Sequence, residues 1–321
     1  MRQQAESAQL IHGYFLCMIN LPQGLTFFER GWLSSNNILL HDSSLAILID
    51  TGYHSHASQT LALVQATLGE QPLNRILNTH LHSDHCGGNA FLHHAYPSLA
   101  ISIPRGHAHL VDAWDANGLT YEPTGQTCPR FTKSDVLLEG ETFEIAGLNW
   151  RVFAAAGHDP HSVILFNESL RILISADALW ENGFGVVFPE IEGISAFDEV
   201  AQTLDIIEKL EPQIVLPGHG SAFVDVPSAI ARARSRLAQF RSSPEKHTNY
   251  ASKVLLKFKL LELQQVDLPS FLDWADKVTY LHLLHKKYAV NTDYRDWIYV
   301  LCKELERSGA CQLTPKSIIN T

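Results

Sequence analysis

The sequence predicts a layered α/β body followed by a helical C-terminal region. Up to residue 216, short apolar runs alternate with segments of helical periodicity, which is typical of buried sheets covered by helices. Beyond residue 226 the periodicity is helical only. The chain has 321 residues, of which 45% are hydrophobic, and this is enough for a sizeable core. We therefore expect two domains, over residues 1–225 and 226–321.

The expected elements follow from these patterns in chain order. Apolar runs predict strands near residues 34–40, 45–50 and 75–79, and helical spacing predicts helices near 57–68 and 88–95. Next come a strand near 99–103, a helix near 105–116, and a Gly-, Pro- and Thr-rich loop over 117–134 that we expect to lie over a functional site. Strands follow near 142–155, 163–166, 171–176 and 213–216, with a helix near 196–210. The C-terminal helices are expected over Pro227–Phe240, Ala251–Leu263, Leu268–Leu284 and Asp293–Ser308, with no strand among them. Periodicity alone does not distinguish a doubly wound sheet from an αβ/βα sandwich.

Four potential metal ligands are concentrated just after the third apolar run. His80, His82, Asp84 and His85 lie within six positions of the segment Thr-His-Leu-His-Ser-Asp-His-Cys-Gly-Gly. On a tight strand-to-helix loop, His80 and His82 can face one metal while Asp84 and His85 face a neighbouring one. Imidazole and carboxylate together suit zinc, with iron or manganese as alternatives. The simpler interpretation is a polar loop without metal, in a chain that contains 17 His.

Three further residues repeat this placement at the ends of apolar strands. His158 follows the run Leu148–Phe153, and His219 lies between two glycines after the run that ends at Pro217. Asp177 closes the apolar run over 171–176, where an unpaired carboxylate would cost several kcal/mol of desolvation. A position between two cations would remove that cost. Each residue alone is more often a hydrogen-bonded structural residue, but their shared placement favours a dinuclear metal site.

The order of these motifs resembles the metallo-β-lactamase superfamily over about residues 30–225, and the first motif resembles its glyoxalase II-type hydrolases. The resemblance implies a four-layer αβ/βα sandwich as the catalytic domain over 1–225, with an added helical domain over 226–321. It implies one metal on His80, His82 and His158, and a second on Asp84, His85 and His219. It also implies that Asp177 bridges the metals and that Asp50 orients ligand imidazoles from behind. The alternative for Asp50 is a turn-forming residue before Thr-Gly.

Such a site predicts hydrolysis. Two cations can bridge a water molecule, lower its pKa from ~15.7 toward neutrality, and hold it as hydroxide beside a polarised carbonyl or phosphoryl group. Asp84 and Asp177 are the candidate catalytic residues, Asp84 because it can relay a proton. Cys86 adjoins the ligands, but a single cysteine at such a position is more often a small buried residue than a nucleophile.

Candidate substrate contacts lie close to the ligands in sequence. His161 stands where many relatives have Gly, and it either touches substrate or lies on the surface. Trp180, Phe184 and Phe188 closely follow the proposed bridging carboxylate, and they line an apolar pocket or pack in the core.

Composition bounds the location and the partners. The five cysteines, at 17, 86, 128, 302 and 311, lack Cys-x-x-Cys spacing, which favours reduced thiols in the cytoplasm. The N-terminus has no signal-peptide pattern, and no apolar stretch approaches membrane-spanning length.

The charge is divided unevenly between the two expected domains. Residues 226–321 hold 15 Lys and Arg against 9 Asp and Glu, a net charge of +6, whereas residues 1–225 hold 9 against 25, a net charge of −16. The basic residues are densest at Arg232, Arg234, Arg236, Arg241, Lys246, Lys253, Lys257 and Lys259. They either receive an anionic substrate group or balance the acidic body as a solvated face.

The function expected from these features is zinc-dependent hydrolysis of a small ester-like molecule, a thioester or a lactone. An endoribonuclease or other phosphodiesterase that uses the same metals is the first alternative, although the acidic body counts against a nucleic-acid partner. A mononuclear iron persulfide dioxygenase and a metal-binding sensor without turnover are further alternatives. The sequence leaves the oligomeric state open.

Overall fold

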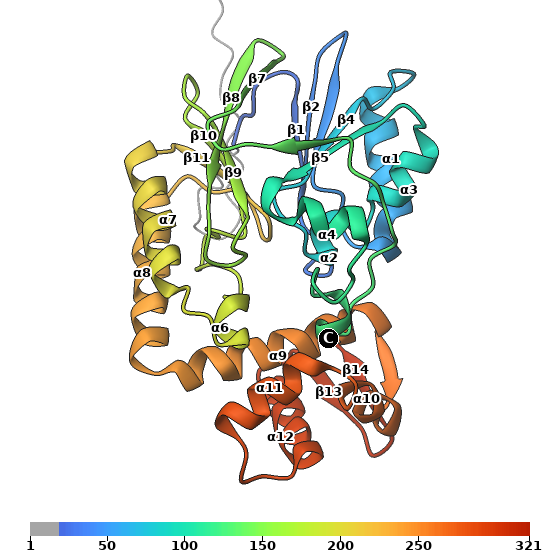
Figure 1. Cartoon of the computed structure of the whole chain (residues 1–321), viewed down its shortest axis with the longest axis vertical. Helices are drawn as coiled ribbons and strands as arrows, with labels where there is room; N and C mark the ends of the chain where they lie inside the picture. The colour runs from blue at the N-terminus through green and yellow to red at the C-terminus, as the bar shows by residue number, and fades with distance from the viewer. Residues whose placement is uncertain (1–18) are drawn as a thin grey trace, which may run out of the picture.

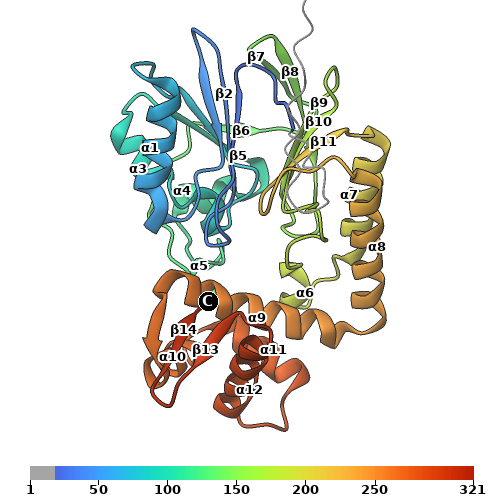
Figure 2. The ribbon, with the colours of Figure 1, turned by 180° about the vertical axis from the view of Figure 1, so that it is seen from behind.

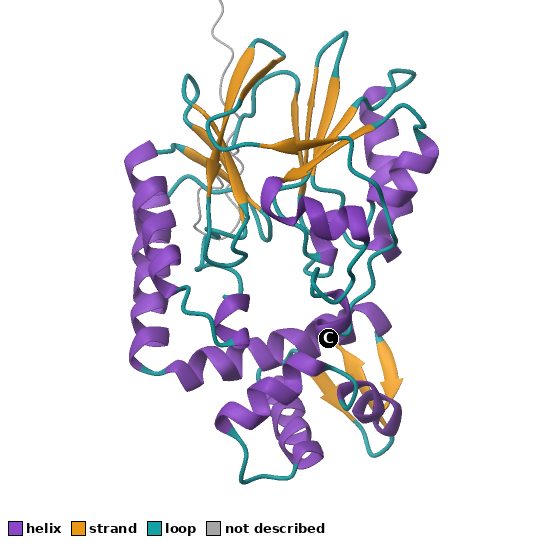
Figure 3. Ribbon diagram, in the orientation of Figure 1, coloured by secondary structure: helices purple, strands orange, loops and turns teal. Residues whose placement is uncertain are grey.

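The computed structural model describes residues 19–321, so Cys17 lies outside the described residues. Two β-sheets face each other in the middle of the molecule, and helices cover the outer face of each sheet (Figures 1 and 3). The C-terminal elements lie together beyond one end of this sandwich. The predicted αβ/βα sandwich with added C-terminal helices is therefore confirmed.

The first sheet has the strand order β1-β2-β3-β4-β5-β6, with β1 to β3 antiparallel and β3 to β6 parallel. Its strands are β1 (Leu25–Phe28), β2 (Asn37–His41), β3 (Ala46–Ile49), β4 (Arg75–Leu77), β5 (Ala100–Pro104) and β6 (Asp135–Leu137). Its helices are α1 (Ala57–Leu68), α3 (Asn89–Ala95) and α4 (Ala108–Ala113). Because side chains alternate along a strand, Leu48 packs under the helices while Ile47 and Ile49 pack against the second sheet.

The second sheet has the strand order β11-β10-β9-β8-β7. Its strands are β7 (Thr142–Ile145), β8 (Leu148–Ala154), β9 (Val163–Asn167), β10 (Ile172–Ala176) and β11 (Ile214–Pro217), and its outer helix is α7 (Phe197–Leu210). The single strand expected near 142–155 is a hairpin. Ala146 and Gly147 both have positive φ angles, 54° and 69°, as a two-residue hairpin turn of the type I′ kind requires.

Helix α8 (Val226–Ser242) belongs to the core of the second sheet, although it follows residue 225, where the sequence analysis places the domain boundary. Ala229, Ile230 and Leu237 pack in the same apolar cluster as Leu204 of α7 and Leu173 of β10. Helix α8 therefore packs in the core of the sandwich, whereas the helices that follow it form a second core.

The C-terminal region consists of α9 (Pro244–Leu263), α10 (Leu268–Ala275), α11 (Thr279–Tyr288) and α12 (Tyr294–Arg307), together with β12 (Gln265–Asp267), β13 (Cys311–Leu313) and β14 (Ser317–Asn320). The expectation of helices alone was wrong, because these strands form a three-stranded sheet. Each has only three or four residues, too few to show a strand period in the sequence. The helix expected over 268–284 is divided in two at residues 276–278.

Helix α9 joins the two parts of the molecule. It turns away from the end of α8 and runs across the open end of the sandwich, as the views from the front and from behind both show (Figures 1 and 2). Phe258 of α9 packs at 5.1 Å, ring centroid to ring centroid, on Tyr53 of the body. None of the helices described between residues 19 and 321 combines the length and apolar character needed to cross a membrane.

Candidate metal centre

The loops after β4, β8, β10 and β11 meet at the end of the sandwich that faces α9, and they bring the predicted ligands together. His80 and His82 come from the loop after β4, and His158 comes from the loop after β8. The Nε2 atom of His158 lies 3.3 Å from Nε2 of His80 and 2.8 Å from Nδ1 of His82, and the last two atoms are 3.0 Å apart. Three imidazole nitrogens therefore face one point.

A second set of donors lies beside the first. Asp84 and His85 belong to a short helical turn, α2 (Ser83–Cys86), and not to irregular loop as the sequence analysis expected. Oδ2 of Asp84 lies 3.1 Å from Nε2 of His219, which follows β11, and 4.0 Å from Nε2 of His85. One turn of helix thus directs the side chains of both Asp84 and His85 toward His219.

Asp177 lies between the two sets. Its Oδ2 atom is 3.4 Å from Nε2 of His158, whereas its Oδ1 atom is 3.4 Å from Nε2 of His85 and 3.8 Å from Nε2 of His219. Each carboxylate oxygen therefore faces a different histidine set. This is the arrangement that a carboxylate bridging two cations requires.

The donor set fits a pair of divalent cations. Nε2 of His85 is buried and has no hydrogen-bond partner within residues 19–321. The facing nitrogens of His80, His82 and His158 lie within 3.3 Å of one another, and a cation at that point would accept a lone pair from each neutral ring. Nitrogen and carboxylate oxygen donors in these proportions suit zinc, iron or manganese.

Burial determines the protonation of the first set. It lowers the pKa of His80 well below the ordinary value of 6.5, lowers the pKa of His82 to about 3, and also lowers the pKa of His158. The neighbouring histidines lower the pKa values of His80 and His82 further. These three imidazoles are therefore neutral at pH 7, which is the form that binds metal.

The second set has the opposite balance. Burial alone would lower the pKa of His85, but the carboxylates of Asp177, Asp50 and Asp84 raise it well above 6.5. Burial would likewise raise the pKa values of Asp84 and Asp177, but the surrounding histidines lower both. The carboxylates of Asp84 and Asp177 are thus ionised, and their negative charge favours a cation at this position.

Hydrogen bonds behind the ligands fix their orientation. Asp50 accepts from Nδ1 of His85 at 2.7 Å, from the backbone N–H of Thr79 at 2.8 Å and from the Thr79 hydroxyl at 2.7 Å. Nδ1 of His158 donates to the carbonyl oxygen of Val186 at 2.5 Å. In both imidazoles this leaves Nε2 directed at the centre.

Two glycines permit the close packing of backbone against these side chains. A Cβ atom at Gly218 would lie 2.3 Å from Oδ1 of Asp177, and one at Gly185 would lie 2.4 Å from Nδ1 of His158. Real Cβ contacts do not occur at such distances, so any other residue at these positions would displace a ligand.

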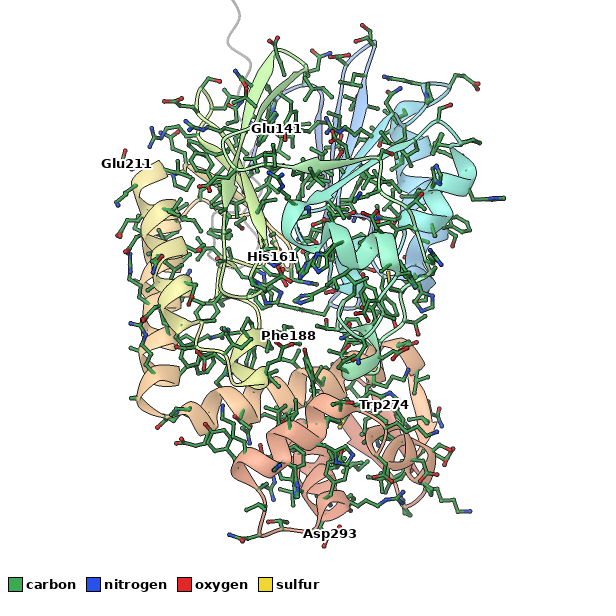
Figure 4. The ribbon with its side chains drawn as sticks, viewed as in Figure 1. Glu141, His161, Phe188, Glu211, Trp274 and Asp293 are labelled. Atoms are coloured by element: carbon green, nitrogen blue, oxygen red, sulfur yellow. The ribbon has the colours of Figure 1, made fainter. Side chains whose placement is uncertain are left out.

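The centre opens into a cavity of about 110 Å³. Of the aromatic residues expected there, Trp180 and Phe188 line it, and Figure 4 shows Phe188 between the sandwich and the C-terminal helices. The expected loop over residues 117–134 also contributes, partly through the short helix α5 (Tyr121–Thr124). The lining residues are Trp32, His82, Asp84, Thr120, Thr124, Gln126, His158, Asp177, Trp180, Gly185, Val186, Phe188, His219, Tyr250, Val254 and Phe258.

Trp32 and three residues of α9 line the cavity although the sequence did not predict them there. Trp32 is 56% exposed and its ring stacks on that of His219, with centroids 5.4 Å apart and an interplanar angle of 3°. Tyr250, Val254 and Phe258 recur every four residues along α9, so the available signal was an apolar stripe at helical spacing.

Three other candidates lie away from the cavity. Phe184 is 1% exposed and packs in the core of the second sheet, in T-shaped contact with Phe240, because its segment turns that ring inward. His161 is exposed, and its ring packs beside that of His107 at 4.6 Å. Cys86 is fully buried, which raises the pKa of its thiol well above 9, so it is not placed for thiolate chemistry.

The basic residues of α8 and α9 do not line the cavity, and several of them pair with carboxylates at the protein surface. Arg234 pairs with Asp205 and Glu208, both at 2.7 Å. Lys253 pairs with Glu304 at 3.2 Å. No Lys or Arg is among the described residues that line the cavity. The geometry favours the interpretation of these residues as a charge-balancing face.

Comparison with known proteins gives a consistent assignment. The sequence model of the family described as Metallo-beta-lactamase superfamily matches residues 30–219. An Atrochrysone carboxyl ACP thioesterase of Aspergillus fumigatus is 25% identical over 220 residues, which cover 68% of this chain and 44% of that protein. A Hydroxyacylglutathione hydrolase of Crocosphaera subtropica is 28% identical over 204 residues, covering 58% of this chain and 62% of the relative. The chain thus matches about half of the length of its curated relatives.

Solved structures share the fold. A metallo-β-lactamase family protein from Thermus thermophilus is 20% identical, covers 94% of this chain and 100% of its own, and superposes with a TM-score of 0.55. A β-lactamase domain protein from Burkholderia ambifaria is also 20% identical, covers 84% of this chain and 89% of its own, and has a TM-score of 0.57. At these identities the likeness supports the fold alone.

Proposed function

The chain belongs to the metallo-β-lactamase superfamily of hydrolases, and on this premise we propose that it hydrolyses a small thioester or lactone with the help of two divalent cations. Zinc is the cation we expect, with iron or manganese as alternatives. The observation that carries the proposal is the placement of Asp177 between two sets of buried donors that open into an apolar cavity. The names of two relatives, a thioesterase and a hydroxyacylglutathione hydrolase, favour a thioester.

We assign the ligands as follows. His80, His82 and His158 would hold one cation, Asp84, His85 and His219 would hold the other, and Asp177 would contribute to both sets. With two cations bound, the site would supply an activated water molecule and a polarised substrate carbonyl group.

Side chains of the protein orient the ligands, accept a proton and exclude water. Asp50 and Thr79 keep the ligand rings in place from behind. The carboxylate of Asp84 is the group that we expect to accept a proton from the attacking water, because Asp84 lines the cavity. The apolar walls exclude bulk water, which strengthens each electrostatic contact at the reacting centre.

The alternatives receive less support. An endoribonuclease needs cations that bind the phosphate backbone, yet no Lys or Arg is among the described residues that line the cavity, and Arg234, Lys253 and Lys257 have partners within the chain. A mononuclear iron dioxygenase needs only one donor set, whereas two complete sets are present. A sensor without turnover does not need a carboxylate aimed at both sets.

The test is elemental analysis of the purified protein combined with a substrate panel. The panel contains coenzyme A and glutathione thioesters, lactones, bis-p-nitrophenyl phosphate and short RNAs. We expect about two metal ions per chain and hydrolysis of a thioester or lactone. Iron at one per chain with sulfur oxidation, or turnover of RNA alone, would refute the proposal.

A further inference from the structure

We propose that the cavity beside the metal centre binds a short, uncharged acyl group and that Val254 of α9 sets the length it accepts. This inference rests on the proposed hydrolysis of esters or thioesters, and it names the part of the substrate that the site recognises.

Apart from the metal ligands, the walls of the cavity are mainly apolar, and Thr120, Thr124 and Gln126 are the polar side chains in the described lining. Trp32 and Trp180 stand on one side of the centre, and their rings meet edge to face with centroids 5.4 Å apart. Phe188 of α6 (Phe188–Glu192) packs against the ligand His82, with ring centroids 4.6 Å apart. A saturated or aromatic group fits such a surface, and each buried methylene contributes about 0.8 kcal/mol.

Two of the polar groups in the lining have partners within the protein. The hydroxyl of Thr124 donates to the carbonyl oxygen of Thr120 at 2.7 Å, and Oε1 of Gln126 accepts from the Ser83 hydroxyl at 2.5 Å. A charged acyl group, such as succinyl, would therefore find no cation in the described lining except at the metal centre itself. Burial of an unpaired carboxylate costs several kcal/mol, so the geometry selects against it.

Helix α9 is built to serve as this wall because it has two apolar faces. Ala251, Leu255 and Leu256 pack in the core of the C-terminal region. Tyr250, Val254 and Phe258 line the cavity, and Tyr250 and Val254 also pack against the edge of that core. A helix that only covered a C-terminal core would need one of these faces and would expose polar residues on the other.

The size of the cavity limits the acyl chain. Its volume of about 110 Å³ is smaller than the roughly 150 Å³ of an apolar protein cavity that accommodates benzene. A chain of fewer than about six carbons, such as butyryl, is therefore the expected optimum.

Val254 is the residue that can be changed with least damage. Phe258 also packs on Tyr53 and holds the two parts of the molecule together, and Tyr250 packs on Phe240 at 5.9 Å, so neither isolates the effect of the cavity. Val254 is only partly buried. Val300 of α12 is 50% exposed and far from the lining, so the same substitutions there are matched controls.

The first experiment compares acetyl, butyryl, hexanoyl, octanoyl and succinyl thioesters of one thiol in the metal-loaded protein. Val254→Phe should lower kcat/KM for hexanoyl relative to acetyl by on the order of 10-fold, and Val254→Ala should raise it for octanoyl by a similar factor. Val300→Phe and Val300→Ala should leave the profile unchanged. Thermal unfolding of all four variants checks that they are folded.

The second experiment needs no turnover. Saturation-transfer NMR on the protein without metal measures the binding of butyl methyl ketone and octyl methyl ketone, neutral mimics of the ester. The shorter ketone should bind better, and Val254→Phe, but not Val300→Phe, should abolish its signal.

The outcomes separate the two proposals. Turnover of thioesters with an identical chain-length profile in both Val254 variants, or a preference for succinyl, overturns the acyl-cavity inference and leaves hydrolysis intact. Absence of turnover with length-selective binding of the ketones refutes the proposed function and supports the cavity. Equal binding of both ketones by wild type and Val254→Phe also overturns the inference.

Discussion

The indole N–H of Trp180 donates a hydrogen bond of 3.2 Å to Oδ1 of Asp177. The same oxygen faces His85 and His219, so Trp180 holds the carboxylate in the orientation that directs its other oxygen at His158. The side chain that bridges the two donor sets is thus fixed by a residue three positions along the chain.

We predict that Trp180→Phe weakens the metal centre without disturbing the fold. The ring is retained but the donor is lost, and loss of a hydrogen bond behind a ligand typically costs 10- to 100-fold in metal affinity or activity. Competition with a fluorescent chelator measures the affinity. Trp297→Phe, on α12, is the matched control. Equal affinities in the two variants would show that the hydrogen bond does not orient Asp177.

We predict that Asp177→Ala removes most hydrolytic activity, by on the order of 100-fold or more, and lowers the metal content. Without this carboxylate the two donor sets lose their shared contact. Asp112→Ala removes an exposed carboxylate that pairs with Lys133 and serves as the control. Full activity of Asp177→Ala on every substrate in the panel would contradict the metal mechanism.

We predict that removal of metal lowers the melting temperature reversibly. Cations that bind only the folded state stabilise it by about 2.7 kcal/mol at 100 times the dissociation constant, which corresponds to about 4 °C in a protein of this size. Differential scanning calorimetry with a chelator, and then with excess zinc, measures the change. A melting temperature that neither the chelator nor excess zinc changes would argue against a site that binds metal in the folded state.

We predict that His247 makes the free energy of unfolding depend on pH in the acidic range. Its Nε2 accepts a hydrogen bond of 3.1 Å from the N–H of Val187, and burial lowers the pKa of His247 to about 4. The unfolded chain, with a pKa of about 6.5, binds more protons below that pH. The stabilisation is therefore complete above about pH 6.5 and is lost as the pH falls toward 4, by up to about 3 kcal/mol.

The test of this dependence is His247→Gln, because a glutamine oxygen can accept the same hydrogen bond but does not titrate. Urea unfolding in the presence of a chelator, from pH 7 to pH 4.5, should show a shallower loss of stability in this variant than in wild type. His94→Gln, at an exposed position, should follow wild type. Parallel curves for His247→Gln and wild type would assign the pH dependence to other groups.

We predict that neutralising Arg232 and Arg234 leaves the Michaelis constant and its salt dependence unchanged. Arg232 donates to the carbonyl oxygen of Glu181, and Arg234 pairs with two carboxylates on the surface of α7. Exposed pairs of this kind contribute about 1 kcal/mol or less, so only a small loss of stability is expected. A raised Michaelis constant for anionic substrates would return these residues to the role of a substrate clamp.

Much of the fold could be predicted because its signals are local. The helix expected near 57–68 matches α1 (Ala57–Leu68), and most strands of both sheets lie within the expected apolar runs, but β1 and β6 were not expected. The hairpin at Ala146 and Gly147 was missed because an uninterrupted strand and two strands joined by two residues have nearly the same composition. The C-terminal strands were missed because they are short.

The amino-acid sequence by itself determined which side chains could bind metal, since His80, His82, Asp84 and His85 are grouped within six positions and the other candidates each follow an apolar strand. Only the tertiary structure decided which carboxylate oxygen faces which histidine, that Phe184 turns into the core while Phe188 borders the cavity, and that a second apolar face of α9 closes the site. The physical reason is the sequence separation of the interactions. The type of ligand and the end of a strand depend on neighbouring residues, whereas the partner of an apolar face depends on packing between segments that are distant along the chain.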